Sequence, residues 1–197
     1  MMPKNTMLII SLLLRNPLNK YNVNQIAREL DVSVGSAYKI VKHLEKKEIL
    51  KSMRMANAIF YSLNMENREA RKICEISIIE DKDRKLSENP VAKVYAKELE
   101  NYPSRSTVLF GSILTGKERA KDVDALFIIG GKKEVKKVNS FCLEVSRTKT
   151  KPIVPFIMTA LDLRNNLQGK NPVVLDIIKT GIVLSGEDVI VEAILNV

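Results

Sequence analysis

The sequence predicts a mixed α/β (α+β) protein built from two folded domains that a helical segment joins. Its 197 residues are enough for one large domain or two small ones. Hydrophobic residues recur at helical spacing early in the chain, whereas from residue 107 onward short strand-like apolar runs alternate with helical stretches. The composition, 45% hydrophobic and 28% charged, is ordinary for a globular protein and argues against disorder.

The first part of the chain predicts three short helices followed by a hairpin. The first helix should end at Asn16, because the following Pro17 disfavours the helical conformation of the residue before it. Asn22 and Ser33 are suitable N-caps for the second and third helices. In chain order we expect helices over 5–16, 22–30 and 34–47, and strands over 49–50 and 59–63.

Residues 65–89 have mixed charge and are expected to form a helical linker between domains 1–64 and 90–197. An apolar stripe on this linker either docks on its own domain, which we favour, or supplies a dimer contact; it consists of Ile73, Ile76 and Ile79. Asn89-Pro90 then starts another helix. Its inward side chains are expected to be Val91, Val94, Tyr95 and Leu99.

The last part of the chain has the alternating pattern of an α/β unit. The predicted strands cover 107–110, 123–129, 153–158 and 182–184. The predicted helices cover 112–120, 132–146, 160–168 and 172–180.

The net positive charge of the chain favours a polyanionic partner. The chain carries 32 basic and 23 acidic side chains, a net charge of +9, and residues 1–65 alone hold ten basic and four acidic ones. A basic module of this kind either attracts nucleic acid or has a solvated basic surface. Charge by itself leaves both open.

Several classes of protein are disfavoured. Cys74 and Cys142 lie far apart and lack metal-ligand spacing, which disfavours a disulfide framework or a zinc site and fits a reducing cytoplasm. The only histidine is His43, so a catalytic triad that needs a histidine would have to use this residue. The apolar run at 7–14 is too short to span a bilayer and lacks a signal-peptide cleavage site, so we expect no membrane association.

The segment VNQIARELDVSVGSAYKIVKHLEKKEILKS resembles the winged helix-turn-helix of MarR-like and ArsR-like regulators. The resemblance covers roughly residues 5–64. It implies that helix 34–47 enters the major groove of double-stranded DNA and that the hairpin lies against phosphate or the minor groove. It also implies a homodimer, because two half-sites need two copies. Glu48 stands where related sequences often have glycine after this helix.

The apolar positions of helix 34–47 are Ala37, Ile40, Val41 and Leu44, and the opposite face of this helix is predicted to bind DNA. The predicted DNA-binding residues of the helix and its N-cap are Ser33, Gly35, Ser36, Lys39, Lys42, His43 and Lys46. Arg54 and Asn57 are the predicted DNA-binding residues of the wing. Each also has a plainer interpretation. In the alternative interpretation, Lys42 and Lys46 are solvated surface charges and Gly35 only permits close helix packing. Some winged helices bind protein alone.

The segment VLFGSILTGKERAKDVDALFII carries the sharpest motif. Gly111-Ser112 follows an apolar strand, Gly116 comes five residues after Gly111, and Asp122 and Asp124 follow. Glycine lets a phosphate approach the backbone, and the serine adds a hydroxyl. Two carboxylates at positions i and i+2 of a strand share one face and can hold Mg²⁺ with its nucleotide.

This spacing resembles the G-S-x-x-x-G and D-x-D signature of the nucleotidyltransferases of the polymerase-beta superfamily, especially the minimal type. The resemblance covers roughly residues 90–197 and implies Asp122 and Asp124 as metal-binding catalytic acids and a nucleoside triphosphate with Mg²⁺ as cofactors. The superfamily normally supplies a third carboxylate from a later strand. That strand should be 153–158, and no acid occurs between Glu144 and Asp162.

These motifs suggest three alternative functions, of which we favour the first. In the first, the chain is a cytoplasmic DNA-binding regulator whose second domain binds a nucleotide and Mg²⁺ without efficient transfer of a nucleotidyl group. Alternatively, it is an active transferase that moves a nucleotidyl group to a protein or small-molecule hydroxyl. A third alternative is an antitoxin-like protein that neutralises a toxin-like partner.

Overall fold

The computed structural model describes residues 2–115 and 120–195, and it confirms a mixed α/β chain of the α+β kind. The chain divides into two compact units between Ser77 and Ile78. This boundary falls inside one long helix, α4 (Arg68–Glu88), which therefore contributes to both units. Within the described residues, no helix is both long enough and apolar enough to cross a bilayer.

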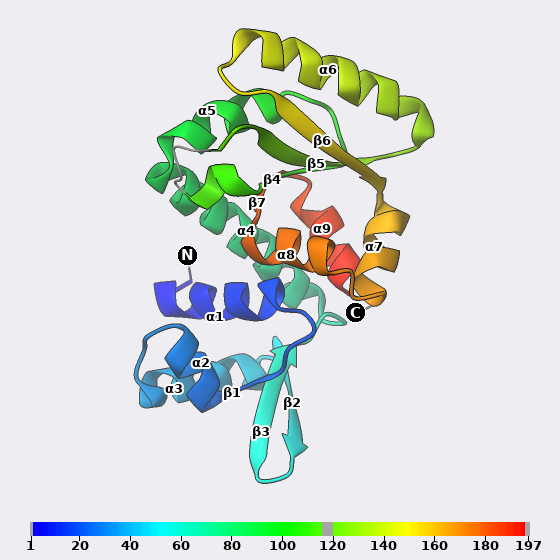
Figure 1. Cartoon of the computed structure of the whole chain (residues 1–197). Coiled ribbons are helices and arrows are strands. Elements are labelled where there is room, and N and C mark those ends of the chain that lie inside the picture. Colours follow the sequence, from blue (N-terminus) through cyan, green and yellow to red (C-terminus); the bar gives the residue numbers. More distant parts are fainter. Residues whose placement is uncertain (1, 116–119, 196–197) are drawn as a thin grey trace. The chain divides into compact units, whose positions relative to one another are not determined.

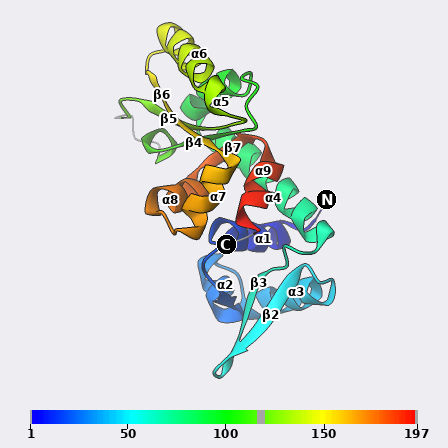
Figure 2. The same ribbon diagram turned by 90° about the vertical axis from the view of Figure 1, so that its right-hand side faces the viewer.

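The first unit packs helices α1, α2 and α3 against a small antiparallel sheet in the order β1-β3-β2 (Figure 1). The three predicted helices and the second hairpin strand are confirmed. The first hairpin strand covers Leu50–Met55 rather than 49–50, because pairing with β3 extends it through the polar residues after Leu50. Figure 2 shows the hairpin extending away from the helices of this unit. The short strand β1 was not predicted, because two residues carry no periodicity. The elements are α1 (Lys4–Arg15), β1 (Tyr21–Asn22), α2 (Val23–Glu29), α3 (Val34–Lys46), β2 (Leu50–Met55) and β3 (Ala58–Leu63).

Both predicted N-caps are present. The amide of Gln25 donates to Asn22 Oδ1 at 2.9 Å, and the amide of Asn22 donates back to Gln25 Oε1 at 2.9 Å. This reciprocal capping box satisfies amides that the first turn of α2 would otherwise leave unpaired. The amide of Ser36 donates to Ser33 Oγ at 3.2 Å and starts α3 in the same way.

The apolar face predicted for α3 is buried except at Ile40, which is half-buried. It meets apolar side chains from the neighbouring helices and strands, so α3 is held by packing as well as by its cap. Fully buried side chains of this core include Ile26, Ala37, Val41, Leu44, Ile49 and Tyr61.

Glu48 occupies the left-handed position that ends α3, with φ of 57°. The amide of Ile49 donates to the carbonyl of Leu44, and the amide of Glu48 donates to that of Glu45, both at 2.9 Å. These two bonds form a Schellman motif, in which glycine is the usual residue because it has no Cβ to clash. The departure from glycine seen in the sequence therefore leaves the helix end intact but strained.

Glu48→Gly is expected to stabilise the protein by about 1 kcal/mol, because it removes the strain of a left-handed non-glycine residue. Urea unfolding followed by circular dichroism measures the change. Glu48→Ala is the matched control, since it removes the same side chain but keeps the Cβ. Equal stabilisation by both variants would show that the side chain, and not the backbone, is responsible.

Helix α4 is followed by α5 (Pro90–Leu99), as predicted, and Tyr95 and Leu99 are buried as expected, but each of the two expected buried faces is wrong in part. Ile76 is 50% exposed and Ile79 42% exposed, and only Ile73 of that stripe is buried. On α5, Val91 and Val94 are also exposed. The buried face of α5 consists of Ala92, Tyr95, Ala96 and Leu99, which follow the i, i+3, i+4, i+7 spacing of one helix face. Two of the four are alanines, whose small side chains permit close packing.

The second unit contains a mixed sheet in the order β6-β5-β4-β7. Strands β5 and β6 are parallel, whereas β4 is antiparallel to both β5 and β7. The predicted strands are confirmed, and helix α9 was not expected. The elements are β4 (Ser106–Phe110), η1 (Ser112–Thr115), β5 (Val123–Ile129), η2 (Lys132–Glu134), α6 (Val135–Thr148), β6 (Ile153–Thr159), α7 (Ala160–Gln168), α8 (Pro172–Thr180), β7 (Ile182–Ser185) and α9 (Glu187–Ile194).

Helices cover the two faces of this sheet differently. Figure 1 shows α6 on one side and α7, α8 and α9 on the other. The α5 and α6 side buries alternate residues of β5, namely Val123, Ala125, Phe127 and Ile129. Asp124, Leu126 and Ile128 lie on the opposite face, because neighbouring strand residues point to opposite sides. In β6, Val154 is paired with Asp124 and Phe156 with Leu126, so both share that second face. Both remain exposed, so this end of the sheet is open.

Candidate functional site

The glycine-serine loop lies directly against Asp124. Phe110, the last residue of β4, is paired with Asp124 in the sheet, so the chain leaves β4 beside that carboxylate. Gly111 follows with φ of 81°, and a Cβ added to it would overlap Asp124 Oδ2 and lie 3.0 Å from Asp124 Cγ. Only glycine fits this position without displacing the acid. The fold therefore places the Gly111 backbone next to the Asp124 carboxylate.

Ser112 is exposed at the start of η1, where its hydroxyl is accessible. The sequence predicted an α-helix over 112–120, but the described residues 112–115 form a single 3-10 turn, in which the Leu114 amide donates to the Gly111 carbonyl at 3.1 Å. Gly116 lies outside the described residues. An α-helix N-terminus facing the phosphates is therefore not among the described features of this loop.

Asn89 is a positioning residue that sequence reasoning missed. Its Oδ1 accepts the Ala92 amide at 2.9 Å and caps α5, as Asn89-Pro90 predicted. Its Nδ2 also donates to the carbonyl of Ile113 at 2.9 Å, which anchors η1. The cap is a local pattern, whereas the second contact spans 24 residues and has no sequence signal.

Asp122 immediately precedes β5, and Asp124 is its second residue. Burial, and then the negative charge of Asp122, raise the pKa of Asp124 above its ordinary value of 3.8. The start of β5 is fixed by the Val123 amide, which donates to the carbonyl of Pro152 at 2.9 Å, and by Lys151, whose ammonium donates to the carbonyl of Ala120. Two carboxylates held this near each other favour a cation between them.

The residue beside Asp124 on the neighbouring strand is Val154. Strand β6 is parallel to β5, and the register pairs Val154 with Asp124 on the same face. Val154 is 45% exposed, so an apolar side chain stands where a third carboxylate would reach the same ion. Throughout residues 2–115 and 120–195, no group of three or more His, Cys, Asp or Glu side chains suits a metal.

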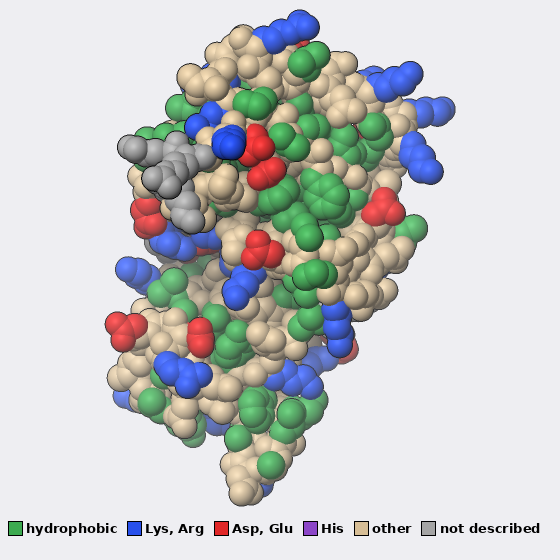
Figure 3. Space-filling view, viewed as in Figure 1, with side chains coloured by type: hydrophobic (Ala, Val, Ile, Leu, Met, Phe, Trp, Pro, Cys, Tyr) green, Lys and Arg blue, Asp and Glu red, His purple; other side chains and the backbone are tan. Residues whose placement is uncertain are grey.

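Among residues 2–115 and 120–195, Asp122 and Asp124 supply two carboxylates of the kind that Mg²⁺ prefers, and no third His, Cys, Asp or Glu joins them. Figure 3 shows one face of the molecule, on which hydrophobic and acidic side chains lie next to each other. By strand register, exposed Val154 and Phe156 share the sheet face of Asp124 and give it an apolar surface.

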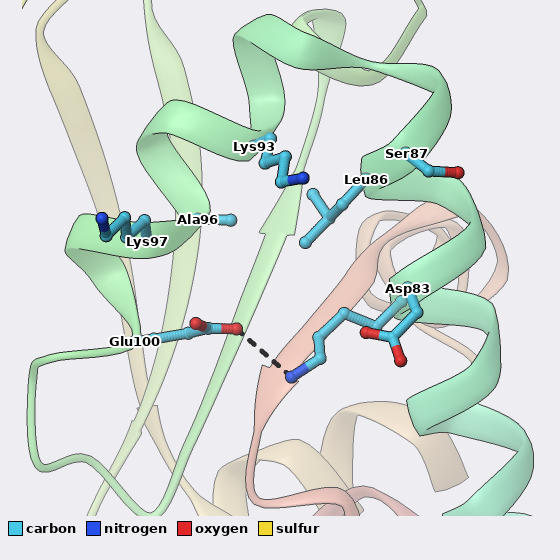
Figure 4. A pocket seen from close by; sticks show the side chains of 8 residues that line it. Asp83, Leu86, Ser87, Lys93, Ala96, Lys97 and Glu100 are labelled. Carbon is cyan, nitrogen blue, oxygen red and sulfur yellow. Dashed lines mark hydrogen bonds and ion pairs between the residues drawn. The ribbon is translucent and has the colours of Figure 1, made fainter.

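A separate hollow of about 500 Å³ lies between α4 and α5. Figure 4 shows Leu86 and Ala96 pointing into it, and an ion pair of 3.2 Å between Lys82 and Glu100 crosses one end. None of its lining residues is one of the predicted nucleotide or metal residues. It is therefore distinct from the candidate nucleotide site.

Both cysteines are buried thiols outside this site. Burial raises the pKa of Cys74 to about 12 and that of Cys142 to about 11. Both are protonated at neutral pH, so neither supplies a thiolate nucleophile.

The predicted DNA-binding face of α3 is largely accessible. Gly35, Lys39, His43 and Lys46 are exposed along one side of the helix, and Ser36 is half-buried. A Cβ added to Gly35 would meet no atom within 4 Å, so close packing is not what places glycine there. The Ser33 hydroxyl already accepts the cap hydrogen bond, although the residue is exposed.

Lys42 differs from the other lysines of this face. Its Nζ lies 2.6 Å from Glu45 Oε2, and the hydrogen bond to Glu45 raises the pKa of Lys42. Hydrogen bonds from Lys42 and then Ser52 lower the pKa of Glu45. The charge of Lys42, one of the predicted DNA-binding residues, is therefore partly neutralised within the chain.

The hairpin carries its predicted polar residues near its tip. Arg54 is exposed and paired with Ile59, and Asn57 is exposed in the turn that joins Met55 to Ala58. The wing also exposes apolar side chains, which the sequence pattern does not predict: Met53 is 49% exposed, Met55 43% and Ile59 44%.

Comparison with known proteins returns no matching family model, no matching curated protein and no matching solved structure.

Proposed function

We propose that the chain is a DNA-binding regulator whose second unit binds a nucleotide together with Mg²⁺ and does not transfer it efficiently. The observation that carries the nucleotide site is the contact between the Gly111 backbone and the Asp124 carboxylate. A glycine with positive φ, an exposed serine and two neighbouring acids come together at the open end of one sheet. This combination suits a phosphate-bound cation better than a solvated acid pair.

Each residue has a separate role in this proposal. Asp122 and Asp124 hold Mg²⁺, which when bound neutralises phosphate charge. Gly111 lets the phosphates approach the backbone, and Ser112 donates its hydroxyl to them. Lys121 is exposed next to the acids and adds a positive charge for the phosphates.

For the first unit, the proposal has α3 in the major groove with Lys39, His43 and Lys46 facing the DNA. The support is a capped, amphipathic helix whose outer side is basic and accessible. A hairpin follows it at once and carries Arg54 and Asn57. Phosphate contacts of this kind supply most of the salt-dependent affinity for DNA.

Lys39→Ala is expected to weaken DNA binding and to lower the slope of log affinity against log salt by about one, the loss of one phosphate contact. Lys42→Ala should change the slope less, because its ammonium is paired with Glu45. Fluorescence anisotropy with labelled duplex DNA at several salt concentrations measures both. Lys4→Ala, an exposed lysine at the start of α1, is the matched control for charge alone. Equal slopes for Lys39→Ala and the control would contradict the assignment of α3.

The catalytic alternative is tested at Val154. Val154→Asp places a third carboxylate beside Asp124, and we expect the number of Mn²⁺ ions bound per chain with a nucleoside triphosphate to rise from about one to about two. Electron paramagnetic resonance counts the bound Mn²⁺. Val173→Asp, at an exposed position of α8, is the matched control. Two bound ions in the unsubstituted protein would favour the active transferase instead.

A further inference from the structure

The sheet face that carries Asp124 is uncovered beside that residue. Along β6, the side chains on this face are Val154, Phe156 and Met158, because alternate residues of a strand share a face. Val154 is paired with Asp124, so this row of side chains starts beside the carboxylate. Val154 is 45% exposed, Phe156 39% and Met158 6%. The exposed fraction thus falls with distance from Asp124, and the open apolar surface adjoins the candidate nucleotide site.

Phe156 differs from most aromatic side chains of the protein. Within residues 2–115 and 120–195, the exposed aromatic residues are Tyr38 and Phe156, and only Tyr38 has a hydroxyl for water to solvate. Phenylalanine has no polar group, so an exposed ring loses the favourable free energy of burial. Leu126, its partner in the sheet, is fully buried on the same face. The ring of Phe156 is therefore accessible to a planar ligand at the margin of a covered surface.

Strand geometry places Phe156 within the length of a nucleotide from the proposed phosphate site. The two residues from Val154 to Phe156 span about 7 Å along the strand, and neighbouring strands lie about 5 Å apart. Phe156 therefore lies roughly 8 Å from Asp124 across the sheet face. The sugar and base of a nucleotide extend away from its phosphates over a comparable length, so both residues can contact one molecule.

We propose that Phe156 stacks on the base of the nucleotide that the second unit binds. This inference rests on the proposed binding of phosphates and Mg²⁺ at Asp122 and Asp124, and it identifies the residue that recognises the rest of the ligand. Ile153–Thr159 carries no charged side chain, so this strand suits an uncharged base and not further phosphates. Every base has a flat face that stacks on an aromatic ring, so the site is tolerant of base identity.

The test compares ATP with inorganic tripolyphosphate, which has the phosphates and lacks the base. Isothermal titration calorimetry of the full chain with Mg²⁺ measures both affinities. Phe156→Ala is expected to weaken ATP binding about tenfold, the effect of losing one stacked base, and to leave tripolyphosphate binding unchanged. Unchanged tripolyphosphate binding also shows that the variant is folded.

Two further variants serve as controls. Phe156→Tyr keeps an aromatic ring and should keep the wild-type affinity for ATP. Leu143→Ala removes an exposed apolar side chain from α6, on the other side of the sheet, and should change neither affinity. The fluorescence of a 2-aminopurine nucleoside triphosphate gives a second measurement, because stacking quenches it. The quenching should be present with Phe156→Tyr and absent with Phe156→Ala.

The outcomes separate this inference from the proposed function. If the wild type binds neither ATP nor tripolyphosphate, the nucleotide site and the stacking inference are both overturned. If tripolyphosphate binds and Phe156→Ala leaves ATP binding unchanged, only the stacking inference is overturned. If Phe156→Ala changes only the mass of the chain in sedimentation, a second copy of the chain covers this face, which also overturns the inference.

Discussion

Asp124→Asn is expected to make the metal-free protein more stable at neutral pH while removing its magnesium-dependent nucleotide binding. The pKa of Asp124 is raised by burial and by the nearby charge of Asp122, so its ionised form is unfavourable in the folded state. Asparagine has nearly the same shape and no charge. The same substitution removes one of the two carboxylates that would hold Mg²⁺. We therefore expect magnesium-dependent nucleotide binding to weaken at least about 100-fold, which exceeds the usual loss of metal affinity when a residue that only supports a metal ligand is replaced.

The pH dependence has a definite sign. For an acid whose folded-state pKa is raised, the stabilising contribution is complete below the unfolded-state pKa and is lost as pH rises through the folded-state value. The advantage of Asp124→Asn should therefore be absent at acid pH, grow as pH rises through the raised pKa of Asp124, and then level off. Thermal unfolding in chelator across this range measures it.

Two controls sharpen this test. Asp176→Asn removes an exposed carboxylate on α8 and should change neither stability nor binding. Added Mg²⁺ with a nucleoside triphosphate should raise the Tm of the wild type and leave that of Asp124→Asn unchanged, because ligands stabilise only the form that binds them. If both proteins gain equally, Asp124 is not a metal ligand.

Gly186→Ala is expected to destabilise the second unit by about 3 kcal/mol or more, because a left-handed residue and overpacking each cost about 1–3 kcal/mol. Gly186 has φ of 71° between β7 and α9. An added Cβ would overlap the carbonyl oxygen of Arg105 and lie 2.7 Å from the Cα of Ser106. Both are backbone groups, so no side-chain rotation relieves the contact.

The neighbouring hydrogen bonds hold that backbone in place. Ser106 Oγ donates to the carbonyl of Ser185 at 2.9 Å, and Thr107 is paired with Ser185 in the sheet. Moving β4 away from Gly186 would therefore disturb the central strands. Chemical unfolding measures the loss of stability.

Gly35→Ala is the matched control for this substitution. Gly35 lies inside α3, and a Cβ there meets nothing within 4 Å. Alanine should stabilise the helix by about 0.5–1 kcal/mol. Opposite signs for the two glycine-to-alanine changes are the expected result, and a neutral Gly186→Ala would show that the β4–β7 corner can relax.

Local patterns predicted much of the structure. Asn22, Ser33 and Asn89 cap helices where expected, because a cap depends on residues only two or three positions away. The strands at Val123–Ile129 and Ile153–Thr159 were also evident as apolar runs. The expected buried faces of α4 and α5 are only partly right, because several large apolar side chains point outward and α5 packs through Ala92 and Ala96 as well as Tyr95 and Leu99. Which face of a helix is buried depends on the neighbouring elements, and a single helix does not encode them.

By itself, the sequence determined the mixed α/β class, most element boundaries, the basic character of the first unit and the glycine, serine and aspartate residues of the candidate nucleotide site. These features depend on local preference, charge and short spacing. Only the tertiary structure decided that Gly111 touches Asp124, that Val154 stands beside it, and that Ile76 and Ile79 face outward. The first two depend on strand register and the last on which side of the helix packs once the chain has folded, and periodicity along the chain specifies neither.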